Sequence, residues 1–105
     1  MEQPNNKYID QLSGDNLEFK AKMISILKRE LPEEIGIYQN QMRNNEMAEA
    51  AQCVHKLKHK ISILGLEKSY YIAEQFEENL KNKSTALQSD FEAILKVMQQ
   101  FVQEL

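Results

Sequence analysis

The stretch that decides the fold is VHKLKHKISILGL, residues 54–66, in which apolar residues recur at helical spacing. Steps of three and four residues place these side chains on one face of a helix, and that face is expected to be buried. A glycine ends the series, and glycine suits the left-handed conformation found at many helix C-termini. We therefore predict a helix from residue 46 to this glycine. Its core face is predicted to be Ala50, Val54, Leu57, Ile61 and Leu64, with Gly65 as the cap.

The same periodicity extends on both sides of this helix. In SGDNLEF, Asp15 is the predicted N-cap of an earlier helix and Glu18 its capping-box partner. Pro32 is expected to kink that helix or to begin a new one, which ends at RNN, residues 43–45. Two further helices are predicted after Gly65, separated by KNKS. Their apolar residues are Leu66, Tyr70, Ala73, Phe76 and Leu80, and then Leu87, Phe91, Ile94, Leu95, Met98, Phe101 and Val102.

Four amphipathic helices joined by short turns predict an all-α, antiparallel up-and-down four-helix bundle. The first ten residues are polar and either fray or carry a short leading helix through Tyr8, Ile9 and Leu12. The 105 residues are enough for one domain, so we expect a single domain over 1–105 with its bundle core at about 15–104.

Composition excludes several classes of protein. No apolar run approaches the roughly 20 residues that span a bilayer, so we expect no membrane contact and a cytoplasmic protein. Cys53 is the only cysteine, which excludes an internal disulfide framework. The net charge of −3 argues against general nucleic-acid binding. The three glycines stand apart, so no glycine-rich loop for ATP is present. No surplus apolar face is evident, and we expect a monomer.

Both histidines lie four residues apart in the central helix. With about 100° per residue and the core face at zero, His55 falls at about 140°, His59 at about 180° and Ser62 at about 120°. All three are predicted to point to solvent, with Ala51 and Gln52 one turn earlier on the same side. A neutral imidazole is a good nucleophile near pH 7. A basic patch is predicted beside it from Lys56, Lys58 and Lys60.

HKLKHKISILGL resembles the signature of histidine-containing phosphotransfer (HPt) domains, in which histidine is followed by x-Leu-Lys-Gly-Ser and later by Leu-Gly-Ala. The residues in register are His55, Leu57, Lys58, Leu64 and Gly65. Downstream, Ala73, Phe76 and Glu77 are similar to the family's small residue, apolar residue and glutamate in the next helix. Upstream, GDNLEFKAKMISILKRELPEEI resembles its first bundle helix and proline break. The resemblance covers roughly residues 8–104.

The resemblance implies a phosphoryl carrier rather than an ATP-using kinase. His55 would accept a phosphoryl group from a receiver-domain phosphoaspartate and pass it to another receiver, with Mg²⁺ held by the receiver and no cofactor on this chain. Lys58 would neutralise phosphoryl charge. The implied partners are response-regulator receiver domains and a hybrid sensor histidine kinase. The implied docking surface around His55 consists of Ala51, Gln52, His59 and Ser62.

The chain departs from the family pattern at His59, which replaces the glycine four residues after the histidine. Its side chain lies one turn along the helix, where it either crowds an incoming receiver or donates a hydrogen bond to the phosphoryl oxygens. Lys60 and Leu66 replace the family's serine and alanine.

Two alternatives stay open. His55 and His59 form an H-x-x-x-H pair of the kind that chelates zinc or copper, although two ligands do not complete a site and the nearby lysines oppose a cation. A degenerate member of the family, or a helical adaptor, would instead bind receiver domains without phosphotransfer.

Overall fold

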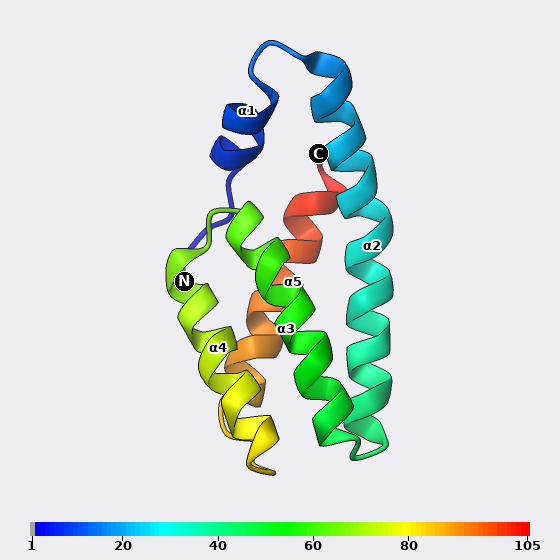
Figure 1. Cartoon of the computed structure of the whole chain (residues 1–105), viewed down its shortest axis with the longest axis vertical. Coiled ribbons are helices and arrows are strands. Elements are labelled where there is room, and N and C mark those ends of the chain that lie inside the picture. The colour runs from blue at the N-terminus through cyan, green and yellow to red at the C-terminus, as the bar shows by residue number, and fades with distance from the viewer. Residues whose placement is uncertain (1) are drawn as a thin grey trace.

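The computed structural model describes residues 2–105, which fold into helices without strands (Figure 1). Four long helices run up and down in chain order, after one short helix. The prediction of an all-α up-and-down four-helix bundle with a short leading helix is confirmed. The helices are α1 (Lys7–Ser13), α2 (Leu17–Arg43), α3 (Met47–Ile63), α4 (Glu67–Lys81) and α5 (Gln88–Gln103).

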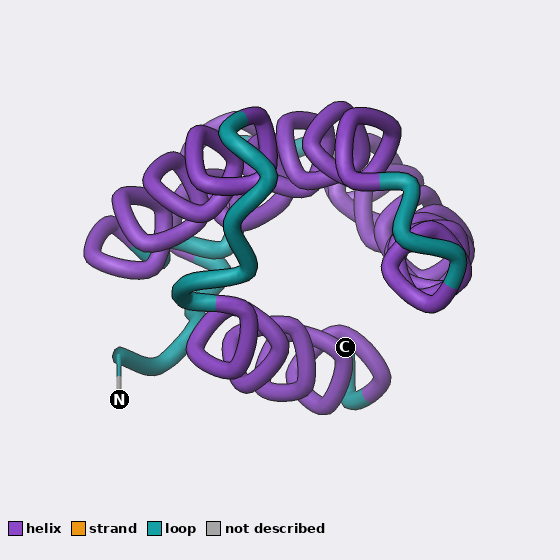
Figure 2. The backbone as a smooth tube through the Cα atoms, turned by 90° about the horizontal axis from the view of Figure 1, so that it is seen from below, coloured by secondary structure: helices purple, strands orange, loops and turns teal. Residues whose placement is uncertain are grey.

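Each long helix packs against its neighbours in sequence, and α5 returns to pack against α2. Seen along the bundle, α2, α3 and α4 follow an arc and α5 lies across from them (Figure 2). The helix α1 packs on the N-terminal part of α2. This arrangement leaves one side of α3 in the core and the other side at the surface.

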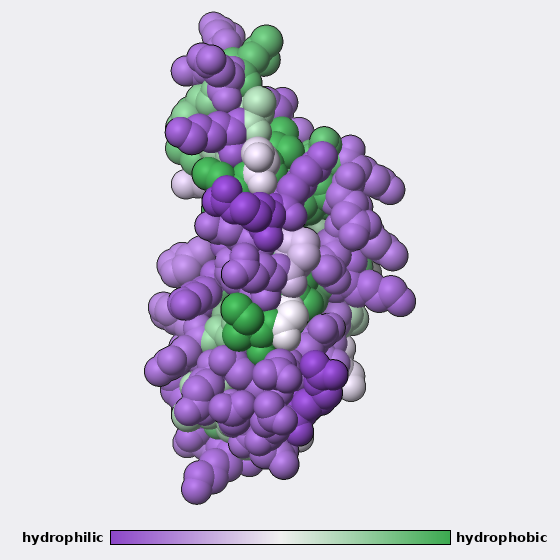
Figure 3. Space-filling view, turned by 90° about the vertical axis from the view of Figure 1, so that its right-hand side faces the viewer, coloured by the Kyte–Doolittle hydropathy of each residue, from purple (hydrophilic) through white to green (hydrophobic). Residues whose placement is uncertain are grey.

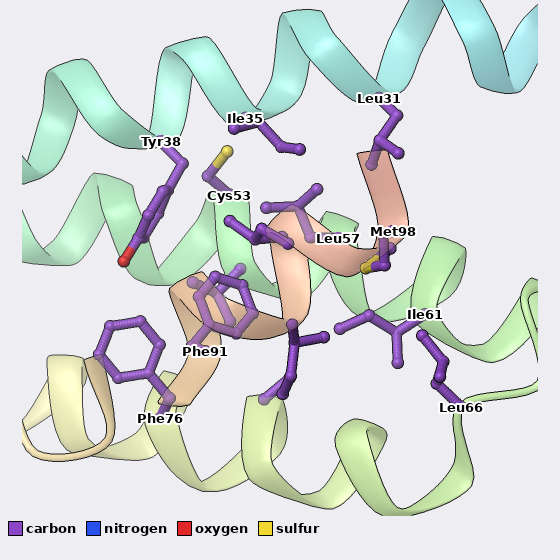
Figure 4. Close-up of a cluster of buried hydrophobic side chains, with 14 of the residues drawn as sticks. Leu31, Ile35, Tyr38, Cys53, Leu57, Ile61, Leu66, Phe76, Phe91 and Met98 are labelled. Carbon is purple, nitrogen blue, oxygen red and sulfur yellow. The ribbon is translucent and has the colours of Figure 1, made fainter. Parts of the chain in front are cut away.

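Large side chains from all four long helices fill the centre (Figure 4). Phe91 lies against Phe76 with ring centroids 5.1 Å apart and against Tyr38 at 5.3 Å. The Tyr38 hydroxyl donates a hydrogen bond of 2.9 Å to Glu92, so its polar end is satisfied. Ile9 of α1 is also fully buried. The predicted core face of α3 is confirmed, because Ala50, Val54, Leu57, Ile61 and Leu64 are all fully buried.

Cys53 lies between α2 and α3 with 6% of its surface exposed. Its Sγ donates to the carbonyl oxygen of Glu34 at 3.3 Å. Burial raises the pKa of this thiol, because the charged thiolate is poorly solvated there.

One prediction about α2 was wrong, and one of two alternatives for Pro32 is excluded. Its N-cap is Asn16 rather than Asp15, and the Asn16 Oδ1 accepts a hydrogen bond of 2.9 Å from the Phe19 amide. Both residue types cap well, so the sequence did not decide between neighbours. Of the two alternatives for Pro32, a kink or a new helix, the structure excludes the new helix, since α2 continues through Pro32 to Arg43. Proline removes one backbone donor, but burial of the flanking Leu31 and Ile35 holds the helix in the bundle.

Gly65 has φ +75° and follows the end of α3, which confirms the predicted left-handed cap. The amide of the next residue, Leu66, reaches back to the Ile61 carbonyl at 3.1 Å. A Cβ at Gly65 would lie 2.7 Å from the Asn5 side chain, so the N-terminal segment packs closely over this turn. Glu2 also binds there, and its carboxylate accepts hydrogen bonds from the first backbone amides of α4.

The face formed by α2 is mostly hydrophilic, with apolar patches between the polar side chains (Figure 3). Phe19, near the start of α2, is 44% exposed. Within residues 2–105, no helix combines the length and the apolar character needed to cross a bilayer.

Candidate functional site

His55 stands on the solvent side of α3, directly after the fully buried Val54. Its side chain is 56% exposed, as the helical angles predicted. The backbone of this turn is fixed by the core residues on its opposite face. The imidazole is therefore presented to solvent by a rigid part of the bundle.

A carboxylate from the next helix holds this imidazole. Glu77 of α4 places Oε2 3.2 Å and Oε1 3.3 Å from His55 Nδ1. Burial alone would raise the pKa of this carboxyl, but hydrogen bonds from Lys58, Lys81 and His55 outweigh burial and lower it. An ionised carboxylate only accepts hydrogen bonds, so Nδ1 carries the hydrogen and donates it. The lone pair of the neutral ring is then on Nε2, the nitrogen that faces away from Glu77.

Lys58 is not part of an exposed patch. Its side chain is only 10% exposed, and its ammonium lies 2.9 Å from Glu77 Oε1 and 5.5 Å from the centre of the Tyr70 ring. The charge of Lys58 is thus compensated by a carboxylate and by the face of an aromatic ring. It acts on His55 through Glu77, since both contact the same carboxylate.

Lys60 also points away from solvent. Its side chain is 12% exposed, and its ammonium pairs with Glu30 at 3.2 Å and Glu34 at 2.6 Å on α2. Of the three lysines in the predicted basic patch, only Lys56 is exposed. The patch prediction was wrong for the other two because acids from neighbouring helices, distant in sequence, neutralise them.

An open groove of about 1060 Å³ runs between the first half of α3 and the last half of α4. His55 and Glu77 line it, and Ala51 and Gln52 continue it toward the start of α3. The prediction that Ala51 lies on the solvent side with His55 was wrong, because Ala51 is 1% exposed and forms part of the floor, whereas Gln52 is exposed as predicted. Two further lysines line the groove, Lys81 as the last residue of α4 and Lys83 in the turn that follows.

His59 and Ser62 are exposed, as predicted, but neither lines this groove. The His59 ring stands edge-on to the His55 ring, with centroids 5.6 Å apart and an interplanar angle of 89°. His59 instead borders a small apolar hollow between α2 and α3, whose other lining residues include Met23, Ile26 and Ile63. The predicted docking residues therefore do not share one concave surface: Ala51 and Gln52 line the groove, His59 borders the hollow, and Ser62 lines neither.

The comparison with protein families decides what this arrangement is. A model of the Hpt domain matches residues 22–105. The chain belongs to the Hpt domain family. A search of curated proteins and a search of solved structures each found no match. The match begins within α2 and includes all of α3, α4 and α5, so the imidazole and its carboxylate both lie in the Hpt domain.

Two residues of the site were not assigned from the sequence of this Hpt domain. Glu77 was noted for its likeness to a family glutamate, but its contact with His55 joins residues 22 positions apart. Lys81 follows Glu77 by one helical turn, and its ammonium lies 3.2 Å from Glu77 Oε2. The i, i+4 spacing of acid and base on a predicted helix was the available signal.

The alternative interpretation, a metal site formed by His55 and His59, has no third ligand in the described part of the chain. Within residues 2–105, no three His, Cys, Asp or Glu side chains are grouped to hold a metal ion. The carboxylate nearest to His55 is already paired with Lys58 and Lys81.

Proposed function

We propose that this Hpt domain is a phosphoryl carrier in a multistep phosphorelay, with His55 as the phosphoacceptor. The observation that carries the proposal is the exposed imidazole whose Nδ1 is bound to the buried carboxylate of Glu77. This contact selects the tautomer in which Nε2 is the nucleophile. The groove beside it provides room for an incoming domain.

In the proposed step, the Nε2 lone pair of His55 attacks the phosphorus of a receiver-domain phosphoaspartate. The new N–P bond forms while the P–O bond breaks, and the bonding electron pair leaves with the aspartate carboxylate. Positive charge develops on the ring, and Glu77 stabilises it through the Nδ1 hydrogen bond. Attack by the aspartate of a second receiver reverses the step and returns the electron pair to Nε2.

The carrier is proposed to exchange its phosphoryl group with partner proteins that bind around His55. We expect Mg²⁺ to be bound by the receiver, where it neutralises phosphoryl oxygens, and a hybrid sensor kinase to supply the phosphoryl group. Ala51, Gln52, His59 and Ser62 are proposed to lie in the receiver interface. Lys58, predicted to neutralise the phosphoryl charge, lies behind Glu77, so we propose that it acts on the site only indirectly, through that carboxylate. A monomer in the cytoplasm suits a carrier that must release each partner.

Label transfer from a phosphorylated receiver domain in the presence of Mg²⁺ tests this function. Acid-labile, base-stable label should arrive on the wild-type chain and on His59→Ala, and none should arrive on His55→Gln. His55→Gln keeps a polar side chain at an exposed position, so its fold should survive. Equal labelling of His55→Gln and wild type would refute the assignment of the phosphoacceptor.

A receiver-binding adaptor is the second candidate, and the position of His59 favours it. Its ring lies 5.6 Å from that of His55 and occupies space next to the nucleophile. If His59 blocks in-line approach, the wild-type chain should bind a receiver without accepting label, and His59→Gly should restore transfer. Transfer to wild type would exclude this candidate.

A further inference from the structure

Glu77 holds two lysines that differ in their freedom to move. Lys58 is 10% exposed at its side chain and has its ammonium between the carboxylate and the Tyr70 ring. Lys81 is 52% exposed at its side chain, and its ammonium reaches the same carboxylate from the solvent side. A long exposed side chain can exchange partners without disturbing the core, whereas the buried lysine cannot.

Lys81 also shares a surface with the imidazole. Lys81 and His55 both line the groove between α3 and α4, and Lys58 is absent from the groove wall. The His55 Nδ1 and the Lys81 Nζ each lie 3.2 Å from Glu77 Oε2. The two groups thus approach one carboxylate oxygen, and Lys81 is the groove-lining lysine that contacts the carboxylate bound to His55.

We propose that Lys81 binds the phosphoryl group on phosphorylated His55. Some or all of the hydrogen bonds that its ammonium donates to Glu77 would then be donated to the phosphoryl oxygens instead. This inference rests on the proposed function of His55. It assigns different roles to the two lysines: Lys58 keeps Glu77 ionised and in place, and Lys81 contacts the transferred group.

The charges at the site support this division. In the unphosphorylated protein Lys58 and Lys81 share the Glu77 carboxylate, and Lys81 also lies 3.6 Å from the exposed Glu78, so two ammonium groups are balanced by two carboxylates. A phosphoryl group on Nε2 adds close to two negative charges and would be repelled by Glu77. An ammonium between the two anions removes that repulsion. Lys58 cannot fill that place without leaving Glu77 and the Tyr70 ring.

Hydrolysis of the phosphorylated protein measures this contact without a receiver. Phosphoramidate can load His55, since Nε2 forms a bond to phosphorus as the P–N bond to ammonia breaks. In hydrolysis, water oxygen attacks phosphorus, the N–P bond breaks and its electrons return to Nε2. The loose transition state carries less charge on the phosphoryl oxygens than the dianion does. A bound ammonium therefore stabilises the phosphorylated protein more than the transition state and slows hydrolysis.

We expect Lys81→Met to shorten the half-life of phospho-His55 by roughly threefold to tenfold, the range for an exposed charge pair strengthened by a dianion. Lys81→Arg should restore most of it. Lys56→Met is the matched control, because Lys56 is exposed, lines the same groove and follows His55 directly. It should change the half-life by less than about twofold if only the general field is affected. Melting temperatures of these variants should stay close to that of the wild type, since all substitutions are at exposed positions.

The outcomes separate this inference from the function on which it rests. Labelled wild type with unlabelled His55→Gln, together with an unchanged half-life in Lys81→Met, would overturn the role of Lys81 and leave the phosphoacceptor intact. An equal loss in Lys56→Met and Lys81→Met would also overturn it in favour of a general charge effect. Failure of the wild type to take label would overturn both.

Discussion

Replacing Glu77 with glutamine should destabilise the protein, because Lys58 would remain charged and buried without an anionic partner. Removing one member of a buried ion pair costs about 3–5 kcal/mol. The glutamine carbonyl can still accept one hydrogen bond from Lys58, which returns about 1 kcal/mol. We therefore expect the free energy of unfolding to fall by about 2–4 kcal/mol, a large part of the total for a domain of this size. The melting temperature should fall by about 10–20 °C.

Urea unfolding of a double-mutant cycle measures this energy directly. The cycle compares wild type, Glu77→Gln, Lys58→Met and the double variant, in which an apolar side chain replaces the buried cation. The double variant should recover about 2 kcal/mol relative to the sum of the single changes. Glu78→Gln is the matched control, since Glu78 is the next residue of α4, is exposed, and has its carboxylate 3.6 Å from the exposed Lys81. It should change the unfolding free energy by less than about 0.5 kcal/mol.

A loss below about 0.5 kcal/mol in Glu77→Gln would refute this reasoning, because it would mean that Lys58 is solvated rather than held against the carboxylate. Additive effects in the cycle would refute the pairing itself. The same variant should also load more slowly in the label-transfer assay, since the amide cannot stabilise positive charge on the ring as a carboxylate does.

Three further predictions follow from other contacts. Gly65→Ala should lower the unfolding free energy by about 1–3 kcal/mol, measured in urea, because φ is +75° and the new Cβ would meet Asn5; adding Asn5→Ala should recover only the steric part. Tyr38→Phe should cost about 1 kcal/mol in the same assay through the lost hydrogen bond to Glu92. The difference in unfolding free energy between wild type and Glu77→Gln should be largest above about pH 4.5 and become smaller at lower pH. The reason is that the pKa of the Glu77 carboxyl is lowered in the folded protein, so protonation at low pH removes the stabilising charge. A gap independent of pH in thermal melts from pH 2 to 7 would contradict the last prediction.

Most of the fold was predictable because local patterns specify it. The apolar periodicity around Leu57 identified the face of α3 that is buried, and Gly65 marked its end. Pro32 left a kink or a new helix as alternatives, and the new helix did not form because tertiary burial of the neighbouring residues outweighed the missing backbone donor. Asp15 and Asn16 are both of residue types that cap helices well, so residue type alone could not decide which of them begins α2.

The site was predictable only where it depends on one helix. The exposure of His55 followed from its angle on α3, but the burial of Lys58 did not, because its partner Glu77 comes from another helix. The angular position of a residue on its helix predicts the direction of its side chain, but it does not predict which residues of neighbouring helices that side chain contacts. The lysine count in residues 54–66 therefore overstated the exposed positive charge, and the acids that neutralise it became visible only after the helices were packed.

The buried thiol of Cys53 is a natural probe of local opening in the bundle. As the single cysteine of the chain, held against the Glu34 carbonyl between α2 and α3, it meets an alkylating reagent only when those helices part. The rate at which Cys53 is alkylated therefore measures how often α2 and α3 separate, and no engineered probe is needed. Cys53 is two residues from His55 on α3. A comparison of its alkylation rate before and after phosphorylation of His55 would therefore show whether phosphorylation stabilises or destabilises the packing of α3.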